Sequence, residues 1–118
     1  MRGVAIPHRG CLYWTTHLPS DPRRRRPVLV VSPDKRNELA TNLVVIPAST
    51  VRRLGPWNVA LRKGEGGLPA PSVLKCEEIA TIPKAWLSER PLGGPLAETR
   101  LREVARCLVR AIDLPFFD

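Results

Sequence analysis

Residues 26–33 read Arg-Pro-Val-Leu-Val-Val-Ser-Pro, and this stretch decides the fold more than any other part of the chain. Its four consecutive aliphatic residues, Val28–Val31, have the length and the β-branched composition that are typical of a central strand. A second aliphatic run, Asn-Leu-Val-Val-Ile-Pro, occupies residues 42–47. We therefore expect both runs to form core strands of one sheet.

Shorter strand signals surround these two runs. Residues 10–17 are rich in aromatic and β-branched types, and weaker strands are predicted at 57–61 and at 72–76, where the last strand can continue through Ile79. The connections at 18–26, 33–41, 50–56 and 62–71 are polar or rich in Pro and Gly. Within the last of them, Gly64–Gly67 (Gly-Glu-Gly-Gly) is typical of a hairpin turn and lacks the Lys and Ser or Thr of a phosphate-binding loop.

Two helices are predicted in the last third of the chain. Pro83–Arg90 is short, and Pro83 suits the first position of a helix. Pro95–Leu114 is the stronger prediction because its apolar residues form one stripe at helical spacing: Leu101, Val104, Leu108 and Ile112. Closely spaced antiparallel strands followed by a terminal helix predict a mainly β fold with α, a small, curved, SH3-like barrel.

Length and charge limit what the chain can be. Its 118 residues suit a single domain spanning 1–118, and no apolar run reaches the ~20 residues that span a bilayer. No signal peptide is recognisable, so we expect a cytoplasmic protein. The net charge is +8, and residues 1–60 hold ten basic against three acidic residues. Such a surface attracts RNA or DNA, an anionic membrane or an acidic protein segment, although a charge that serves only solubility accounts for it equally well.

The cysteines and histidines predict no metal or thiol chemistry. Cys11, Cys76 and Cys107 are far apart and odd in number, so we interpret them as buried small side chains. Only His8 and His17 are available as imidazole partners, and their spacing pairs them with no cysteine. We expect no metal ion and no other cofactor.

Two polar clusters flank the core strands. Arg23–Arg26 leads into the first strand, where Pro27 and the strand can hold the Arg26 guanidinium in one orientation toward a phosphate. Ser49 and Thr50 follow the second strand. If the two strands pair, Arg26 and Ser49 converge on one rim of the barrel. An arginine run that is merely solvated is the alternative.

Four ordered features resemble the MazF/PemK (Kid-like) toxins of type II toxin–antitoxin systems, whose fold is also that of CcdB. They are Arg9-Gly10 followed by Leu12-Tyr13-Trp14; Arg26–Pro33 with Asn37 after it; Val44–Thr50; and Ser72-Val73 with Glu77–Ile82, followed by Trp86-Leu87. The chain departs from the family pattern at Cys11, in the short loop 18–25, at Ser49, where Thr is commoner, and at Glu78, where Gln is usual.

The resemblance implies a homodimeric, metal-independent, sequence-selective endoribonuclease that cleaves single-stranded RNA and is neutralised by an acidic antitoxin. It implies that Arg26 and Ser49 are catalytic. The residues that we expect to contact the RNA are Arg25, Thr50, Arg52, Arg53 and Glu78.

Two alternatives remain open from the sequence. A CcdB-like toxin binds a topoisomerase and cuts nothing, but such toxins end in Trp-Gly-Ile, whereas this chain ends in Leu-Pro-Phe-Phe-Asp. A barrel that binds RNA or an acidic protein without catalysis is the other.

Overall fold

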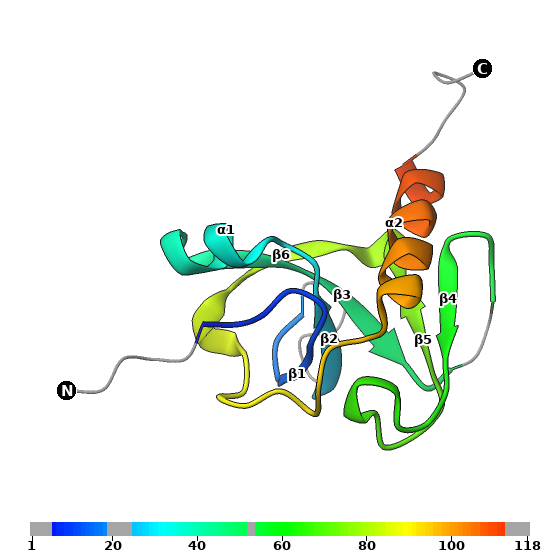
Figure 1. Ribbon diagram of the computed structural model, residues 1–118, viewed down its shortest axis with the longest axis horizontal. Helices are drawn as coiled ribbons and strands as arrows, with labels where there is room; N and C mark the ends of the chain where they lie inside the picture. Colours follow the sequence, from blue (N-terminus) through cyan, green and yellow to red (C-terminus); the bar gives the residue numbers. More distant parts are fainter. Residues whose placement is uncertain (1–5, 19–24, 52–53, 113–118) are drawn as a thin grey trace.

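The computed structural model describes residues 6–18, 25–51 and 54–112. The described chain forms a six-stranded antiparallel sheet, two α-helices and three short 3-10 turns (Figure 1). The strands are β1 (Leu12–Thr15), β2 (Arg26–Val30), β3 (Asn42–Ser49), β4 (Asn58–Leu61), β5 (Ser72–Lys75) and β6 (Ala80–Pro83). The helices are α1 (Asp34–Leu39) and α2 (Glu98–Ile112), and the 3-10 turns are η1 (Glu65–Gly67), η2 (Cys76–Glu78) and η3 (Lys84–Trp86).

Strand β3 organises the sheet because it pairs with three other strands. One of its edges pairs with β2, with Leu29 opposite Ile46. The other edge pairs with β6 along Asn42–Val45 and with β5 at Ala48 and Ser49. The two aliphatic runs of the sequence are thus neighbouring strands, as the prediction requires.

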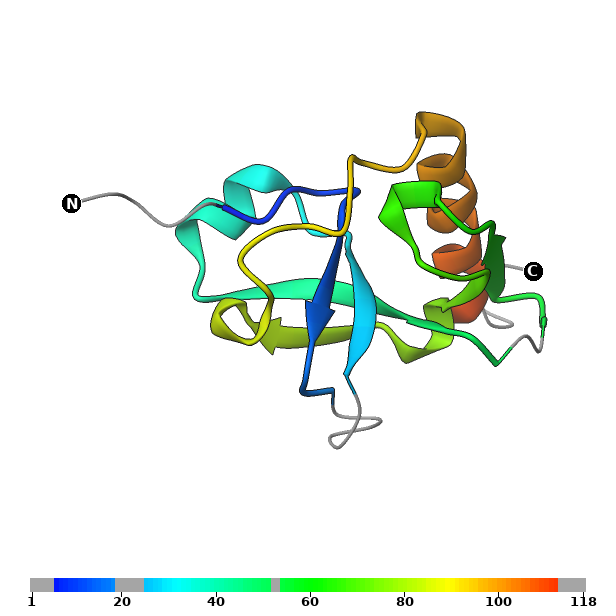
Figure 2. The same cartoon turned by 90° about the horizontal axis from the view of Figure 1, so that it is seen from below.

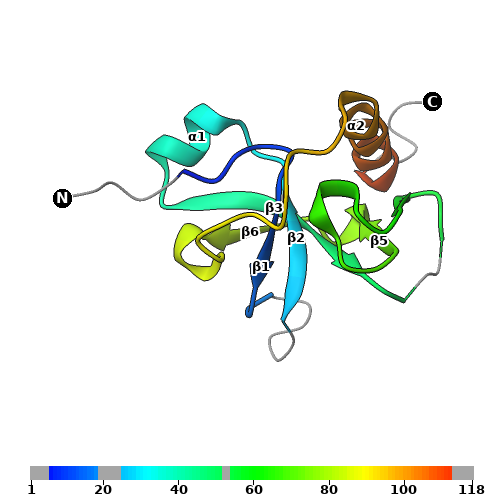
Figure 3. The same ribbon diagram turned by 60° about the horizontal axis from the view of Figure 1, so that its bottom comes forward.

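The sheet is curved, and among the described strands it stays open. The hydrogen-bonded order is β1-β2-β3-β5-β4, with β6 beside β3, so β1 and β4 end the path and no pairing joins them. The β1–β2 pair projects from the sheet, away from both helices (Figure 3). The antiparallel fold with its terminal helix is confirmed, whereas closure into a barrel is not observed.

Successive side chains of a strand point to opposite faces of the sheet, and β3 therefore contributes to two hydrophobic clusters. Leu43 and Val45 of β3 contribute to one cluster, and Ile46 and Ala48 contribute to the other, which α2 covers. Helix α2 stands beside the β4–β5 hairpin in two views (Figures 1 and 2). Within α2, Val104 and Cys107 are buried, while Ile112 is 65% exposed. The predicted stripe is therefore wrong at Ile112, because the buried side of the helix continues from Cys107 to Ala111, which packs against the same core.

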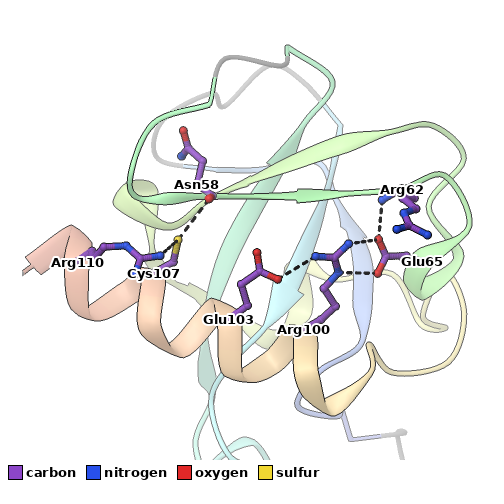
Figure 4. A network of polar contacts seen from close by, with 7 residues as sticks. All are labelled: Asn58, Arg62, Glu65, Arg100, Glu103, Cys107 and Arg110. Carbon is purple, nitrogen blue, oxygen red and sulfur yellow. Dashed lines mark hydrogen bonds and ion pairs between the residues drawn. The ribbon is translucent and has the colours of Figure 1, made fainter.

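A polar network ties α2 to the hairpin loop between β4 and β5 (Figure 4). Arg100 donates to both carboxylate oxygens of Glu65, at 2.9 and 3.1 Å, and to Glu103 at 2.9 Å. Glu65 also accepts the backbone N–H of Arg62 at 2.7 Å. The predicted turn is present, and it requires glycine at Gly67, whose φ is 85° and where a Cβ would lie 2.3 Å from the carbonyl oxygen of Leu92.

The helix predicted at 83–90 is absent. Residues 80–83 form β6 beside β3 instead, and only η3 follows. The backbone of Ser88 is held by β1, since its N–H donates to the carbonyl of Trp14 at 2.8 Å and its Oγ accepts the Trp14 N–H at 3.1 Å. Conversely, the connection 33–41 contains α1, whose polar sequence gave no helical stripe. Buried Asn37 fixes α1 by donating to the carbonyls of Pro7 and Ser32.

Candidate active site

A cavity of about 190 Å³ lies where β1 and β3 end and β2 begins. It is lined by Trp14, Arg25, Arg26, Pro27, Ala48, Ser49, Thr50, Val51, Pro69, Ala70 and Ser72. The lining combines two guanidinium groups, three hydroxyl side chains and one indole ring, and within the described part of the chain it includes no acidic residue. Such a surface suits an anionic ligand.

Arg26 and Ser49 meet at this cavity because of the register between β2 and β3. The pairing ends with Val28 opposite Pro47, and Arg26 and Ser49 lie two residues beyond that pair, each on its own strand. Ser49 is 6% exposed, and its Oγ accepts the backbone N–H of Val51 at 3.1 Å. That bond leaves the Ser49 hydroxyl proton free to be donated to a ligand oxygen. Arg26 is half-buried at the start of β2.

The other predicted contacts divide into three groups. Arg25 and Thr50 are exposed and line the same cavity. Glu78 does not line it, since Glu78 belongs to η2 and lies 3.7 Å from Lys75 in an ion pair. Arg52 and Arg53 lie outside the described residues, as do Arg23 and Arg24.

Two lining residues were missed as site residues by the sequence reasoning. The guanidinium of Arg25 lies over the ring of Trp14, 4.4 Å from its centroid. The sequence shows that the first strand is aromatic, but only the contact with Arg25 gives Trp14 a place in the site. Ser72 is buried, and its Oγ donates to the carbonyl of Ala70 at 3.0 Å. Ser72 is the first residue of β5 and stands in one of the stretches that resemble the family, but nothing in that stretch marks it as a site residue.

The cysteines stay outside the candidate chemistry. All three are buried, as the sequence predicted. Burial and the neighbouring Cys107 raise the pKa of Cys76 to about 12, and burial raises the pKa of Cys11. A thiol with a raised pKa is a poor nucleophile at neutral pH. Among the residues that the structure describes, no group of His, Cys, Asp or Glu could hold a metal ion, and no helix is long and apolar enough to cross a membrane.

Comparison with known proteins identifies relatives over almost the whole chain. Residues 8–112 match the family described as PemK-like, MazF-like toxin of type II toxin-antitoxin system. Endoribonuclease MazF6 of Mycobacterium tuberculosis is 37% identical over 112 residues, which are 90% of this chain and 96% of the relative. Endoribonuclease MazF2 of Mycobacterium bovis has the same identity and coverage.

Solved structures show the same fold. An endoribonuclease in complex with its cognate antitoxin from a mycobacterial species superposes with a TM-score of 0.76 at 25% identity, covering 93% of this chain and 98% of that one. The Mycobacterium tuberculosis toxin MazF-mt6 has a TM-score of 0.75 at 26% identity, covering 90% and 99%. These matches favour a nuclease over both alternatives that the sequence left open.

Proposed function

The chain belongs to the PemK-like, MazF-like toxin family of type II toxin–antitoxin systems, and we propose that it acts there as an endoribonuclease that cleaves single-stranded RNA without a metal ion. The observation that carries the proposal is one cavity lined by both Arg26 and Ser49. We propose that residues 1–118 form one domain and that the protein works in the cytoplasm, where RNA substrates are found.

RNA brings its own nucleophile to this cavity. A 2′-hydroxyl that is held in line with the adjacent phosphate can attack it without a metal-bound water, and good orientation of such an attack is worth roughly 7–11 kcal/mol. The products are a 2′,3′-cyclic phosphate and a free 5′-hydroxyl. The protein then needs to position the phosphate and to stabilise its developing charge.

The two catalytic residues have different tasks in this proposal. Arg26 presents a guanidinium fork to the phosphoryl oxygens and stabilises the charge that grows on them. Ser49 donates its hydroxyl proton to the phosphate while its oxygen accepts the N–H of Val51. Thr50 and Arg25, which line the same cavity, contact the RNA chain on either side.

The test is incubation of the purified protein with a long, unmodified single-stranded RNA, with and without excess EDTA. We expect cleavage in both conditions and fragments that end in a 2′,3′-cyclic phosphate. Loss of cleavage on chelation would contradict the metal-independent mechanism. Intact RNA in both conditions would overturn the proposal as a whole.

We further propose that the protein is a homodimer and binds an acidic antitoxin over its basic surface. Sedimentation should give about twice the 13.1 kDa mass of one chain at micromolar concentration. The affinity for a cognate acidic peptide should fall with salt, because several charge pairs form at once. Such a peptide should also inhibit cleavage, since the arginines at the cavity lie within the surface that it covers.

A further inference from the structure

The guanidinium of Arg25, the residue directly before β2, covers one face of the Trp14 ring. In the β1–β2 register Trp14 lies opposite Pro27, and Arg26 lies opposite Thr15. Arg25 directly precedes β2 and lies two residues before Pro27, so its side chain can reach the ring of Trp14 diagonally across the two chain segments. The distance of 4.4 Å from the Arg25 guanidinium to the ring centroid fits this placement. Arg25 thus contacts the ring of Trp14, and both Arg25 and Arg26 line the cavity.

The backbone of Trp14 is held on both sides, whereas the Arg25 side chain that covers its ring is exposed. The backbone of Trp14 is fixed on one side by the ladder with β2 and on the other by its two hydrogen bonds with Ser88. Arg25 precedes β2, belongs to no strand and is exposed. Its guanidinium can leave the ring by side-chain rotation alone.

We propose that Trp14 is the stacking platform for one unpaired base of the RNA, and that Arg25 covers this platform until the base displaces it. The displaced guanidinium then contacts the RNA backbone. This inference rests on the proposed function for the identity of the ligand, but it concerns binding and assigns Trp14 and Arg25 no part in bond cleavage.

The relative strengths of the two contacts favour the exchange. An exposed cation–π contact is worth roughly two- to fivefold in an equilibrium constant, whereas stacking of a base on an aromatic side chain is worth roughly five- to hundredfold. The freed guanidinium also gains a charge-assisted bond to a phosphate. Exchange is thus favourable, and the cost of uncovering the ring is small.

The cavity has the dimensions and the chemistry for a single base. Its volume of about 190 Å³ lies below the roughly 300 Å³ at which pockets for drug-sized ligands begin. Trp14 is the one aromatic side chain in its described lining, and Arg26 and Ser49 line the same space. A base on Trp14 therefore lies next to the phosphate that these two residues hold.

Binding of two RNA probes with equal charge measures the stacking. The first is a random-sequence pool of short RNA in which every 2′-hydroxyl is methylated, so that it cannot be cut. The second is the same backbone without bases. For the unchanged protein we expect the base-bearing pool to bind at least fivefold more tightly than the abasic probe.

Two substitutions then separate the platform from its cover. Trp14→Leu should reduce the preference for the base-bearing pool to less than twofold, whereas Trp57→Leu, at an exposed tryptophan away from the cavity, should leave it unchanged. Arg25→Gln should weaken binding of the abasic probe and raise the preference two- to fivefold, because the base no longer competes with the guanidinium. The matched control Arg102→Gln removes the same charge from α2 and should leave the preference as it is.

Several outcomes overturn the inference. If Trp14→Leu leaves the preference intact, the bases stack elsewhere. If Arg25→Gln lowers the preference, the base stacks on the guanidinium and does not replace it, and if the preference is unchanged, Arg25 is a phosphate contact only.

A fluorescence measurement covers the case in which Trp14→Leu fails to fold. The double variant Trp57→Phe, Trp86→Phe leaves Trp14 as the sole tryptophan of the three in the chain. Its emission should be quenched by the base-bearing pool and not by the abasic probe, and equal responses to both overturn the inference.

Failure of the proposed function gives a different pattern. If Trp14→Leu and Arg25→Gln change the preference as expected while unmodified RNA stays intact, the stacking platform is supported and the nuclease function is wrong. If neither probe binds, both are wrong.

Discussion

The cavity at the strand ends and the seam between α2 and the β4–β5 hairpin both contain arginine, but the side chains around the arginines differ. In the seam, Arg100 donates to Glu65 and Glu103, and each of these three side chains has a charged partner that fixes it (Figure 4). At the cavity, the guanidinium of Arg25 lies over the ring of Trp14, and Arg26 shares the lining with the hydroxyl side chains of Ser49, Thr50 and Ser72. The first arrangement joins two parts of the fold, and we propose that the second binds the phosphate of RNA.

The difference shows how one residue type acquires two functions. Arg100 projects from a helix beside a loop that carries Glu65, so the fold itself supplies the counter-charge. Arg25 and Arg26 stand at the entry of β2, opposite strand ends that supply Ser49 and Trp14. Substitutions in the two regions should therefore affect different measurements, cleavage in one and stability in the other.

The largest effect is expected at Arg26. Arg26→Ala should lower the single-turnover cleavage rate by about 10²–10³, because it removes the fork that stabilises the phosphoryl charge. Arg26→Lys should restore little, since one ammonium cannot form two parallel bonds. Arg102→Ala, at an exposed ion pair on α2, is the control and should cut at the normal rate. Equal damage from Arg24→Ala and Arg26→Ala would mean that the catalytic register is misassigned.

A smaller loss is expected at Ser49, and it should exceed the loss at Thr50. Ser49→Ala should slow cleavage by about tenfold or more, because a buried donor to the phosphate disappears. Thr50→Ala should cost a fewfold at most, since Thr50 is exposed, and Ser49→Thr should preserve the hydroxyl and the rate. Circular dichroism of each variant checks the fold, and a larger effect at Thr50 would reverse the two roles.

The sequence was most informative where local patterns and tertiary contacts agree. The aliphatic runs at 28–31 and 42–47 had to be buried, so β2 and β3 follow from composition alone, and their pairing brings Arg26 to Ser49. Residues 83–90 could not be predicted in this way. Pro83 suits a helix start as well as a strand end, and only the bonds between Ser88 and Trp14, 74 residues apart, decide between them.

The site was predictable in part for the same reason. Arg26 and Ser49 stand in short motifs, and the register of two strong strands places them together. Trp14 could not be assigned because its role depends on the contact with Arg25 across strands. The seam could not be predicted for a similar reason, because Glu65, the carboxylate partner of Arg100, lies 35 positions earlier in the chain.

The smallest effect tests the seam directly. Glu65→Gln removes the ion pair with Arg100 and should lower the free energy of unfolding at neutral pH. Because the pair is partly exposed, the loss should be only about 1 kcal/mol, which corresponds to a fall in Tm of about 3–6 °C.

The hydrogen bonds from Arg100 hold the pKa of Glu65 below its usual value of 4.5. A carboxyl with a lowered pKa stabilises the fold above its unfolded pKa and loses that contribution as the pH falls through its folded value. The Tm difference between Glu65→Gln and the unchanged protein should therefore be greatest at neutral pH and shrink below about pH 4.5.

Thermal unfolding across this pH range measures the Tm difference. The control is Glu98→Gln, at an exposed ion pair of α2, which should change the Tm little. RNA cleavage by Glu65→Gln at neutral pH should stay normal, and a loss of cleavage without a loss of stability would show that the seam and the cavity are not separate.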